Sequence, residues 1–248
     1  MGRLTELRRK VKKTNILMRN RIWRDAAFKG VAAAIEHRHT LRDLDFGTCI
    51  DVGANRGQFS LLVRGLKPDC RIYAFEPLAE PAAHFEEVHR PGETVTLYRH
   101  ALGSQRETRE IQVHAKSDSS SFLPPEDVRQ YGKIAEIVAS EEVRIERLDD
   151  VLKPADLSPR TLLKLDVQGF EAEVLAGASG LLDRVEWIYT EVAFAPLYAG
   201  QPLFNDLHDM LTALGYVPKR IGHVSGTPVN VQSTADFLYQ KSGGSTAA

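Results

Sequence analysis

Apolar residues follow two kinds of spacing along most of the chain, and together they predict an α/β fold. Short apolar runs indicate buried strands, and between them apolar residues recur at helical intervals. The expected strands cover 49–53, 71–76, 94–98, 161–167, 186–194, 216–220 and 235–240, and the expected helices cover 57–66, 79–89, 171–178 and 204–214. This alternation predicts a mostly parallel sheet with helices on both faces. We expect the last two strands to form an antiparallel pair at one edge.

The alternation is interrupted between residues 104 and 150. Glu110–His114 and Val143–Arg147 alternate with a period of two, which predicts a pair of antiparallel strands. Between them lie serines at 117–121, a pair of prolines and a polar helical stretch around 126–138. We interpret this segment as a small insertion or lid over the functional site, and the alternative is an ordinary flexible surface loop.

The N-terminal stretch 3–24 is strongly basic. It carries nine Lys and Arg residues against a single acid, Glu6, and Leu4, Leu7 and Val11 share one helical stripe. Two interpretations stay open: a surface helix that makes peripheral contact with anionic lipid or an acidic partner, and a solvated helix or frayed terminus. Residues 25–44 are expected to be helical and to cover the sheet or the mouth of the site.

The expected organisation is a basic helical extension over residues 1–45, one α/β domain over 46–241 and a disordered tail over 242–248. A chain of 248 residues with 43% hydrophobic content is long enough for one such domain with a full core. The net charge of −1, and the lack of an aromatic-rich basic patch, argue against a nucleic-acid partner. The oligomeric state is left open.

Cysteine usage and hydropathy bear on location. Cys49 and Cys70 form no CxxC pair, which favours reduced thiols and a cytoplasmic protein. No apolar run reaches about 18 residues, so no transmembrane helix is expected. The basic N-terminus lacks the apolar segment of a secretory signal.

The stretch Thr48–Ser60 predicts a strand, a glycine-containing turn and a helix start. Gly53 and Gly57 are four residues apart, so the backbone is able to pass close to a flat ligand. The next strand ends in Glu76, about 20 residues further on, where nucleotide-binding units place a carboxylate for the ribose hydroxyls. The alternative is a strand–helix turn and a capping acid that bind no ligand.

The glycine spacing also bears on the kind of nucleotide. Dinucleotide sites use G-x-G-x-x-G because a pyrophosphate needs bare amides, but here Asn55 stands at the second glycine position. S-adenosylmethionine (SAM) has no phosphates and needs no such cradle. The pattern Asp51-x-Gly-x-x-x-Gly followed by Phe75-Glu-Pro therefore favours SAM over NAD. The alternatives are a nucleotide-dependent oxidoreductase on a related fold and a non-catalytic module that acts through its basic N-terminus.

Glu76, Asp166 and Glu191 all fall at the expected carboxyl ends of parallel strands. Buried acids need hydrogen-bond donors, a cation or a metal, and the sulfonium of SAM is a cation. Methyl transfer to an alcohol also requires removal of a proton. Asp166 is the first candidate for the base or for a metal ligand, and Glu191 is the second. The alternative for Asp166 is a cap on the following helix.

Other polar residues are weaker candidates. Further acid–base candidates are His100, His114, His208 and His223, although a histidine on an ordinary strand or helix is more often structural. Asp149 and Asp150 precede an apolar pair and are expected to cap a helix rather than to bind a metal.

Several motifs resemble the FkbM-type SAM-dependent methyltransferases, in the order typical of that family. They are Asp51-Val-Gly-Ala-Asn-Arg-Gly57, Phe75-Glu-Pro77, His100-Ala-Leu-Gly103, Arg147-Leu-Asp-Asp150, Leu163–Glu171, Val174-Leu-Ala-Gly177 and Glu191-Val192. The resemblance covers about residues 46–240. It implies a class I methyltransferase domain with a Rossmann-like fold, SAM as cofactor, and O-methylation of a hydroxyl on a small molecule, such as a saccharide or a polyketide-like product.

The resemblance also implies roles for individual residues. On the cofactor side, Asp51, Gly53, Asn55 and Gly57 would line the methionine and ribose end, Glu76 would bind the ribose hydroxyls and Ala101 would lie near adenine. Asp166 and Glu171 would lie near the acceptor. The family usually has an acid at the position of Gln168, and this departure leaves the participation of a divalent metal open. We therefore assign no metal ligand.

Overall fold

A seven-stranded sheet forms the centre of the protein, in a computed structural model that describes residues 11, 13–89, 94–115, 117–126, 136–227 and 230–243. Its strands, in spatial order, are β3 (Val95–Tyr98), β2 (Arg71–Phe75), β1 (Thr48–Val52), β7 (Thr161–Leu165), β8 (Val185–Ala193), β10 (Asn230–Lys241) and β9 (Tyr216–Thr227). The first five are parallel, and β10 pairs antiparallel with both β8 and β9. The expected Rossmann-like sheet with an antiparallel edge is confirmed.

The strand order reverses between β1 and β7. The chain runs from β1 outward to β2 and β3 and then returns to the other side of β1. Both central strands are buried along their whole length, which fits their nearly continuous apolar sequences. Ligands of doubly wound sheets bind outside the carboxyl ends of the strands at such a switch point. The fold therefore predicts a ligand site at the turns that follow β1 and β7.

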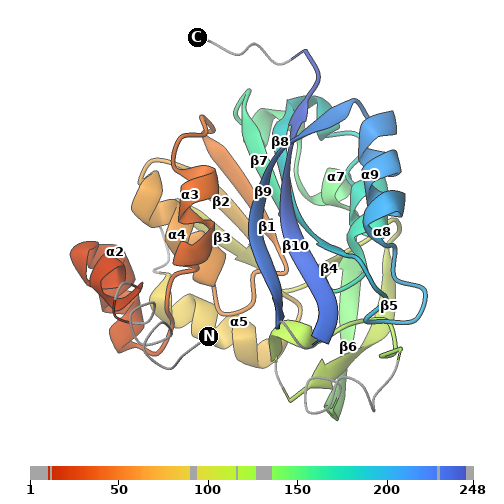
Figure 1. Cartoon of the computed structure of the whole chain (residues 1–248), viewed down its shortest axis with the longest axis horizontal. Coiled ribbons are helices and arrows are strands. Elements are labelled where there is room, and N and C mark those ends of the chain that lie inside the picture. Colours follow the sequence, from red (N-terminus) through yellow and green to blue (C-terminus); the bar gives the residue numbers. More distant parts are fainter. Residues whose placement is uncertain are drawn as a thin grey trace.

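Helices cover both faces of the sheet (Figure 1). One face carries α4 (Gln58–Leu66) and α5 (Ala79–Val88), and the other carries α7 (Leu148–Val151), α8 (Glu171–Ala176) and α9 (Phe204–Ala213). Neighbouring residues of a strand serve opposite cores, because their side chains alternate across the sheet. Cys49 packs in the core under α4, whereas Ile50 packs in the core under α8.

The N-terminal segment packs against α4. Residues 13–19 are helical, and α2 (Arg21–Phe28) follows, with the Asn20 side chain accepting hydrogen bonds from the first backbone N–H groups. The indole of Trp23 is buried and donates to the carbonyl of Leu61 at 2.7 Å. Of the predicted apolar stripe, Leu4 and Leu7 lie outside the described residues, and Val11 is exposed.

The prediction of one helix over 25–44 is wrong in its middle. The helix α2 ends at Phe28, Gly30 adopts a left-handed conformation (φ +85°), and 31–34 have no regular structure. A short 3₁₀ turn, η1 (Ile35–His37), and the helix α3 (Arg38–Leu41) follow. The amide of Ala34 donates instead to the carbonyl of Gln58, at 3.0 Å. A contact with the main domain has thus replaced the helix that the alanines favour.

The interrupted region, residues 104–150, supplies two strands of a second, three-stranded sheet, and the third strand directly precedes it. The order is β4 (Ala101–Leu102), β6 (Ile137–Glu146) and β5 (Glu107–His114). The antiparallel pairing of β5 with β6 confirms the prediction. Of the helix expected over 126–138, residues 127–135 lie outside the described part of the chain, and Ile137 and Val138 belong to β6, so that end of the prediction is wrong.

Asp149 and Asp150 do not cap a helix as predicted. They lie inside the first turn of α7, whose N-cap position is Arg147. The guanidinium of Arg147 donates to both carboxylate oxygens of Asp149, at 2.9 and 2.7 Å. The carboxylate of Asp149 also accepts the N–H of Gly180, at 3.3 Å, so it joins α7 to a different turn and does not cap its own helix.

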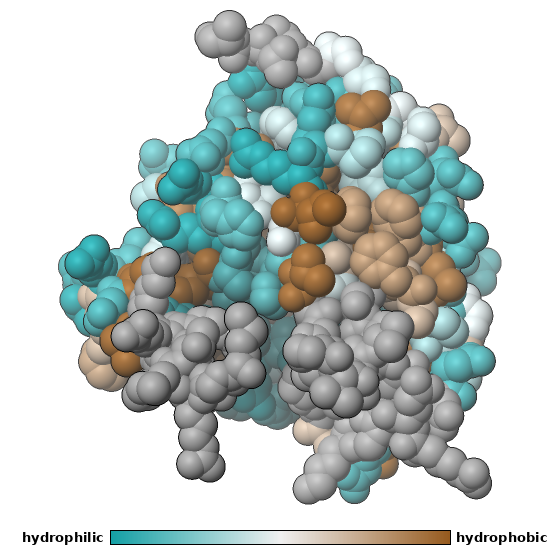
Figure 2. All heavy atoms as spheres, viewed as in Figure 1, coloured by the Kyte–Doolittle hydropathy of each residue, from teal (hydrophilic) through white to brown (hydrophobic). Residues whose placement is uncertain are grey.

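The edge strand β9 exposes Val217, Ile221 and Val224. Apolar groups lie near the middle of the face where Figure 1 places β9 and β10 (Figure 2). Among the helices of the described residues, none is long and apolar enough to cross a membrane.

Candidate active site

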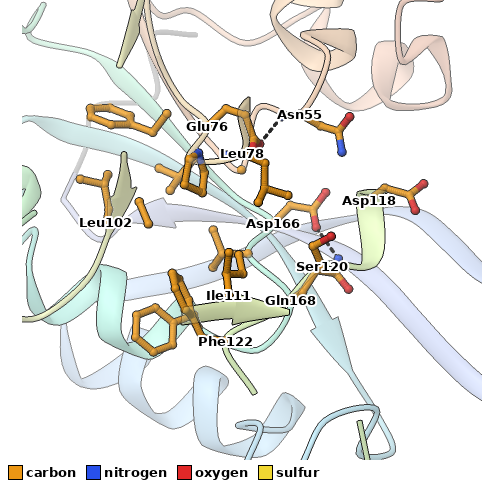
Figure 3. A pocket seen from close by; sticks show the side chains of 17 residues that line it. Asn55, Glu76, Leu78, Leu102, Ile111, Asp118, Ser120, Phe122, Asp166 and Gln168 are labelled. Carbon is orange, nitrogen blue, oxygen red and sulfur yellow. Dashed lines mark hydrogen bonds between the residues drawn. The ribbon is translucent and has the colours of Figure 1, made fainter. Parts of the chain in front are cut away.

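A cavity opens at the carboxyl ends of β1, β2 and β7 (Figure 3). Its apolar walls are Phe75, Leu78, Leu102, Ile111, Phe122 and Phe170. Its polar groups are Asn55, Glu76, Asp118, Ser120, Asp166 and Gln168. Ala101 also lines it, next to Leu102. An apolar pocket with a few converging polar groups is the usual form of a small-molecule site.

The turn after β1 depends on its glycines. Gly53 has φ +74°, and a Cβ there would overlap the backbone carbonyl oxygen of Asp166. Gly57 has φ +88°, and a Cβ there would lie 2.6 Å from the ring of His89. Asn55, between them, is also left-handed (φ +48°), a conformation that asparagine tolerates better than most residues. The turn therefore brings the backbone of β1 against that of the β7 turn, with Gly53 and Asn55 lining the cavity.

Glu76 is almost completely buried at the end of β2, and its carboxylate faces the β1 turn (Figure 3). One oxygen accepts the N–H of Asn55 and the other accepts the N–H of Leu78, both at 2.9 Å. Burial raises the pKa of Glu76 to about 7, against the opposing effect of these two hydrogen bonds. Each carboxylate oxygen is able to accept a further donor. These free acceptor positions and the apolar walls fit an adenosine whose ribose hydroxyls donate to Glu76.

Asp51 does not line this cavity. It is fully buried behind the turn, where it accepts the hydroxyl of Ser60 at 2.7 Å and pairs with the ammonium of Lys164 at 3.3 Å. Lys164 also donates to the carbonyls of Val52 and Gly53 and lies 3.7 Å from Asp166. Burial alone would lower the pKa of Lys164, but the charges of Asp51 and Asp166 outweigh it and raise the pKa. Lys164 was not among the candidate residues, and its one signal in the sequence is a lysine inside an apolar strand.

The turn after β7 carries Asp166, which lies between the cavity and a second cleft. Its side chain is 42% exposed. The amide of Gln168 donates to Asp166 at 2.8 Å and to Glu191 at 3.3 Å. Gln168 itself is left-handed, with φ +53°. Asp166 does not cap α8, since no side chain caps that helix, and the capping alternative is wrong.

Glu191 and Glu171 lie behind Asp166 and outside the lining of the cavity and the second cleft. Glu191 accepts the hydroxyl of Thr234 at 2.8 Å, and burial together with the charge of Asp166 raises its pKa to about 8. Glu171 is buried and accepts the N–H groups of Val167 and Gly169, and burial raises its pKa to about 7. Through these two hydrogen bonds Glu171 stabilises the backbone of the turn.

The interrupted region covers the site, as the lid interpretation predicted. The hydroxyl of Ser121 donates to the carbonyl of Gln168 at 2.7 Å, and the rings of Phe122 and Phe170 lie 5.0 Å apart. The guanidinium of Arg109, on β5, lies 5.6 Å from each of these two rings. In Figure 3, Asp118 and Ser120 lie at the same end of the cavity as Asp166.

A second cleft, of about 410 Å³, adjoins the cavity and shares Gly53, Asn55, Asp118 and Asp166 with it. Its volume falls in the range of small-molecule sites. The segment 30–34 forms one wall, and among its polar side chains are His37, Lys164 and Asp236. Neither His37 nor Asp236 was a sequence candidate, because neither lies in a motif.

The four histidines that were candidates do not line either space. His100 packs against Phe75, and burial lowers its pKa. His208 lies 3.2 Å from the hydroxyl of Tyr239. Within the described residues, no group of three or more His, Cys, Asp or Glu side chains is arranged to hold a metal ion.

Comparisons with known proteins identify the family. The model of the methyltransferase FkbM domain matches residues 51–218. The 2-O-methyltransferase NoeI of Sinorhizobium fredii is 29% identical, over 68% of this chain and 72% of that protein. Methyltransferase 1 of Beauveria bassiana is 30% identical, over 67% of this chain and 71% of that protein.

Two solved structures resemble the chain. Magnesium protoporphyrin IX methyltransferase from Synechocystis PCC 6803, with bound SAM, has a TM-score of 0.43 and 12% identity, and the match covers 93% of this chain and 83% of that one. Sp1610 of Streptococcus pneumoniae, in complex with SAM, has a TM-score of 0.48 and 12% identity, and covers 86% of this chain and 73% of that one.

The family match decides against the nucleotide-dependent oxidoreductase and the non-catalytic module. It spans more than half of the sequence and includes the turns after β1 and β7. The chain therefore belongs to the FkbM methyltransferase family, and it is a SAM-dependent methyltransferase with a class I, Rossmann-like fold.

Proposed function

We propose that the protein is an O-methyltransferase that transfers the methyl group of SAM to a hydroxyl of a small molecule or saccharide. The main support is the arrangement of two spaces that adjoin at Asp166. One is a largely apolar cavity with a buried carboxylate, and the other is a polar cleft of small-molecule size. The name of the relative NoeI, a 2-O-methyltransferase, supports a hydroxyl as the acceptor.

The residues of the first cavity fit the parts of SAM. Glu76 would accept the ribose hydroxyls, and the turn that contains Gly53, Asn55 and Gly57 would pass along the ribose and methionine. Ala101 would lie near adenine, in the apolar wall beside Leu102. Asp51 would act indirectly, through the ion pair that positions Lys164 beside the turn. When bound, SAM supplies a methyl group made electrophilic by its sulfonium.

Asp166 is the carboxylate that we propose to contact the acceptor hydroxyl. It lines both spaces, and Lys164 and Gln168 hold its two oxygens from the protein side. A hydroxyl that donates to Asp166 would be oriented with a lone pair toward the cofactor cavity. Glu191 would act through Gln168 and would not contact the acceptor itself.

We also propose a cytoplasmic location. Cys49 and Cys70 are both buried free thiols, and burial raises the pKa of Cys70 to about 12. Buried thiols that form no disulfide fit a reducing compartment.

Isothermal titration calorimetry with SAM and with S-adenosylhomocysteine tests the cofactor assignment. We expect both to bind, and the absence of binding by either at millimolar concentration would remove the proposal. Transfer of a radiolabelled methyl group from SAM to a panel of methyl glycosides and simple alcohols tests the acceptor class. Methylation of amines or thiols in place of any hydroxyl would refute the O-methyltransferase assignment.

A further inference from the structure

Three side chains from distant parts of the sequence meet at the wall of the second cleft. They are His37 of η1, Tyr189 of β8 and Asp236 of β10, and all three line the cleft. Nδ1 of His37 lies 2.9 Å from the hydroxyl of Tyr189 and 3.3 Å from a carboxylate oxygen of Asp236. His37 and Asp236 both lie outside the residues 51–218 that match the family model.

The carboxylate of Asp236 favours one tautomer of His37. An ionised carboxylate only accepts hydrogen bonds, so Asp236 favours a proton on the ring nitrogen that faces it. That nitrogen is Nδ1, and the neutral imidazole then carries its lone pair on Nε2. Burial and the charge of Asp236 raise the pKa of Tyr189 above its ordinary range, so the phenol stays neutral and does not compete as an anion.

Packing fixes the orientation of the imidazole. The ring of His37 lies 5.9 Å from the ring of Phe59, 5.6 Å from that of Tyr189 and 6.0 Å from that of His223. Gly222 makes room for the hydroxyl of Tyr189, because a Cβ at that position would overlap it. Only 17% of the His37 side chain and 16% of the Asp236 side chain are exposed. These contacts hold the imidazole of His37 in one orientation at the wall of the cleft, as a functional side chain requires.

We propose that His37 is the general base for the acceptor hydroxyl, and that Asp236 is the residue that positions it. This inference rests on the proposed function. The acceptor hydroxyl would give its proton to Nε2 of His37 while its oxygen bonds to the methyl carbon. The carbon–sulfur bond breaks with its electron pair going to sulfur, so the sulfonium becomes a thioether. Its positive charge is replaced by that of the imidazolium, which Asp236 stabilises.

The chemistry of the two candidate bases favours this division of roles. Imidazole is the most common general base in enzymes, and the two carboxylate oxygens of Asp166 already contact Gln168 and Lys164. Asp166 would orient the hydroxyl and His37 would accept the proton. The charged and titratable groups that face His37 are Glu36 on its own element, Tyr189 on β8, His223 on β9 and Asp236 on β10. Lys164 on β7 lines the same cleft and interacts electrostatically with Asp236.

The kinetic test compares His37→Gln with His39→Gln in the full-length protein, with radiolabelled SAM and a panel of methyl glycosides as acceptors. His39 is exposed, lies two residues away and is not part of the cleft lining, so it is the matched control. We expect His37→Gln to lower kcat by about 10²-fold or more, the usual scale of a general base, with the affinity for SAM unchanged within about twofold. A kcat equal to that of the His39→Gln control, at normal SAM affinity, would overturn the inference.

The pH profile separates proton transfer from a merely structural role. With SAM saturating, so that the pH dependence of binding at Glu76 does not enter, we expect wild-type kcat to fall on the acid side as the imidazole is protonated, and the residual rate of His37→Gln to lack this limb. Asp236→Asn should lower kcat with the affinity for SAM unchanged, because the imidazolium loses its stabilising carboxylate. An acid limb that is unchanged in His37→Gln would contradict the assignment.

A spectroscopic test does not depend on an acceptor. Long-range ¹H–¹⁵N correlation spectra, with the His37 signals assigned by their loss in His37→Gln, report the protonated ring nitrogen directly. We expect the Nδ1–H tautomer in the neutral ring, and an Nε2–H tautomer would overturn the inference even if no glycoside is methylated. Failure of SAM to bind would instead remove the proposed function, whatever the tautomer.

Discussion

Glu76 should make the affinity for an adenosine ligand depend on pH. Burial raises its pKa to about 7, and ribose hydroxyls would donate to the ionised carboxylate. If only the ionised form binds, the Kd is multiplied by 1 + 10^(pKa − pH). This factor is about 11 at pH 6 and about 1.1 at pH 8, so binding should be about tenfold weaker at pH 6, or about 1.4 kcal/mol.

Titration calorimetry with 5′-methylthioadenosine measures this effect without interference from the amino acid part of SAM, which titrates itself. Glu76→Gln should abolish the pH dependence between pH 6 and 8. The exposed Glu87, on α5, offers a matched control in Glu87→Gln, which should keep it. Truncation in Glu76→Ala should weaken SAM binding by about 1–3 kcal/mol, the scale of lost hydrogen bonds to a charged group.

A double-mutant cycle then asks whether the carboxylate contacts the ribose. It combines Glu76→Gln with the change from adenosine to 2′-deoxyadenosine or 3′-deoxyadenosine. Direct hydrogen bonds predict that the two losses are not additive, with a coupling energy within the range of about 0.5–3 kcal/mol. Additive losses, together with a wild-type affinity that is constant from pH 6 to 8, would refute the assignment of Glu76 to the ribose.

Three further changes test other parts of the site. Asp166→Asn should lower turnover by about 10²-fold, the scale of a misoriented acceptor, and leave SAM affinity within about threefold, as measured by methyl transfer and calorimetry; retained turnover would reassign Asp166. Gly53→Ala should destabilise the fold by about 2–4 kcal/mol in urea unfolding, because φ is +74° and the new Cβ would meet Asp166; a loss below about 0.5 kcal/mol would contradict this contact. The pKa of Glu191 is raised to about 8 from the 4.5 of a free glutamate, so its contribution to stability is fully present below about pH 4.5 and is lost as pH rises toward 8. Glu191→Gln should therefore gain stability over the wild type from pH 5 to 8, by about 3–4 kcal/mol, and a constant difference would contradict the raised pKa.

The site residues at the ends of consecutive strands could be predicted from the sequence. Gly53, Asn55 and Glu76 lie on consecutive strand ends, so a spacing rule places them without knowledge of the sheet order. The buried strand before Asp166 carries its own signal in continuous apolar residues. These features depend on local pattern alone, and the structure places all four residues around one cavity.

The second cleft depends on pairings that local pattern does not encode. The sequence predicted that the last two strands would pair, but not that β10 would lie between β8 and β9. That order places Asp236 beside Glu191 in the register and brings it to His37. The alanine-rich segment 31–35 favours a helix by propensity, yet it runs irregularly along the cleft, because Gly30 ends α2 and a contact with Gln58 replaces the helical bond.

Gln168 explains how two acids are held so close to each other in this protein. A carboxylate at this position, as the family resemblance implies, would add a charge between Asp166 and Glu191 and could not donate to either of them when ionised. The amide of Gln168 instead donates to both, and the hydroxyl of Tyr198 lies 3.0 Å from its carbonyl oxygen. The left-handed backbone at Gln168 turns its own carbonyl toward the hydroxyl of Ser121 in the covering segment. One neutral side chain therefore joins Asp166, Glu191 and Tyr198, and its backbone joins the lid, so that Asp166 keeps a fixed position between the two spaces.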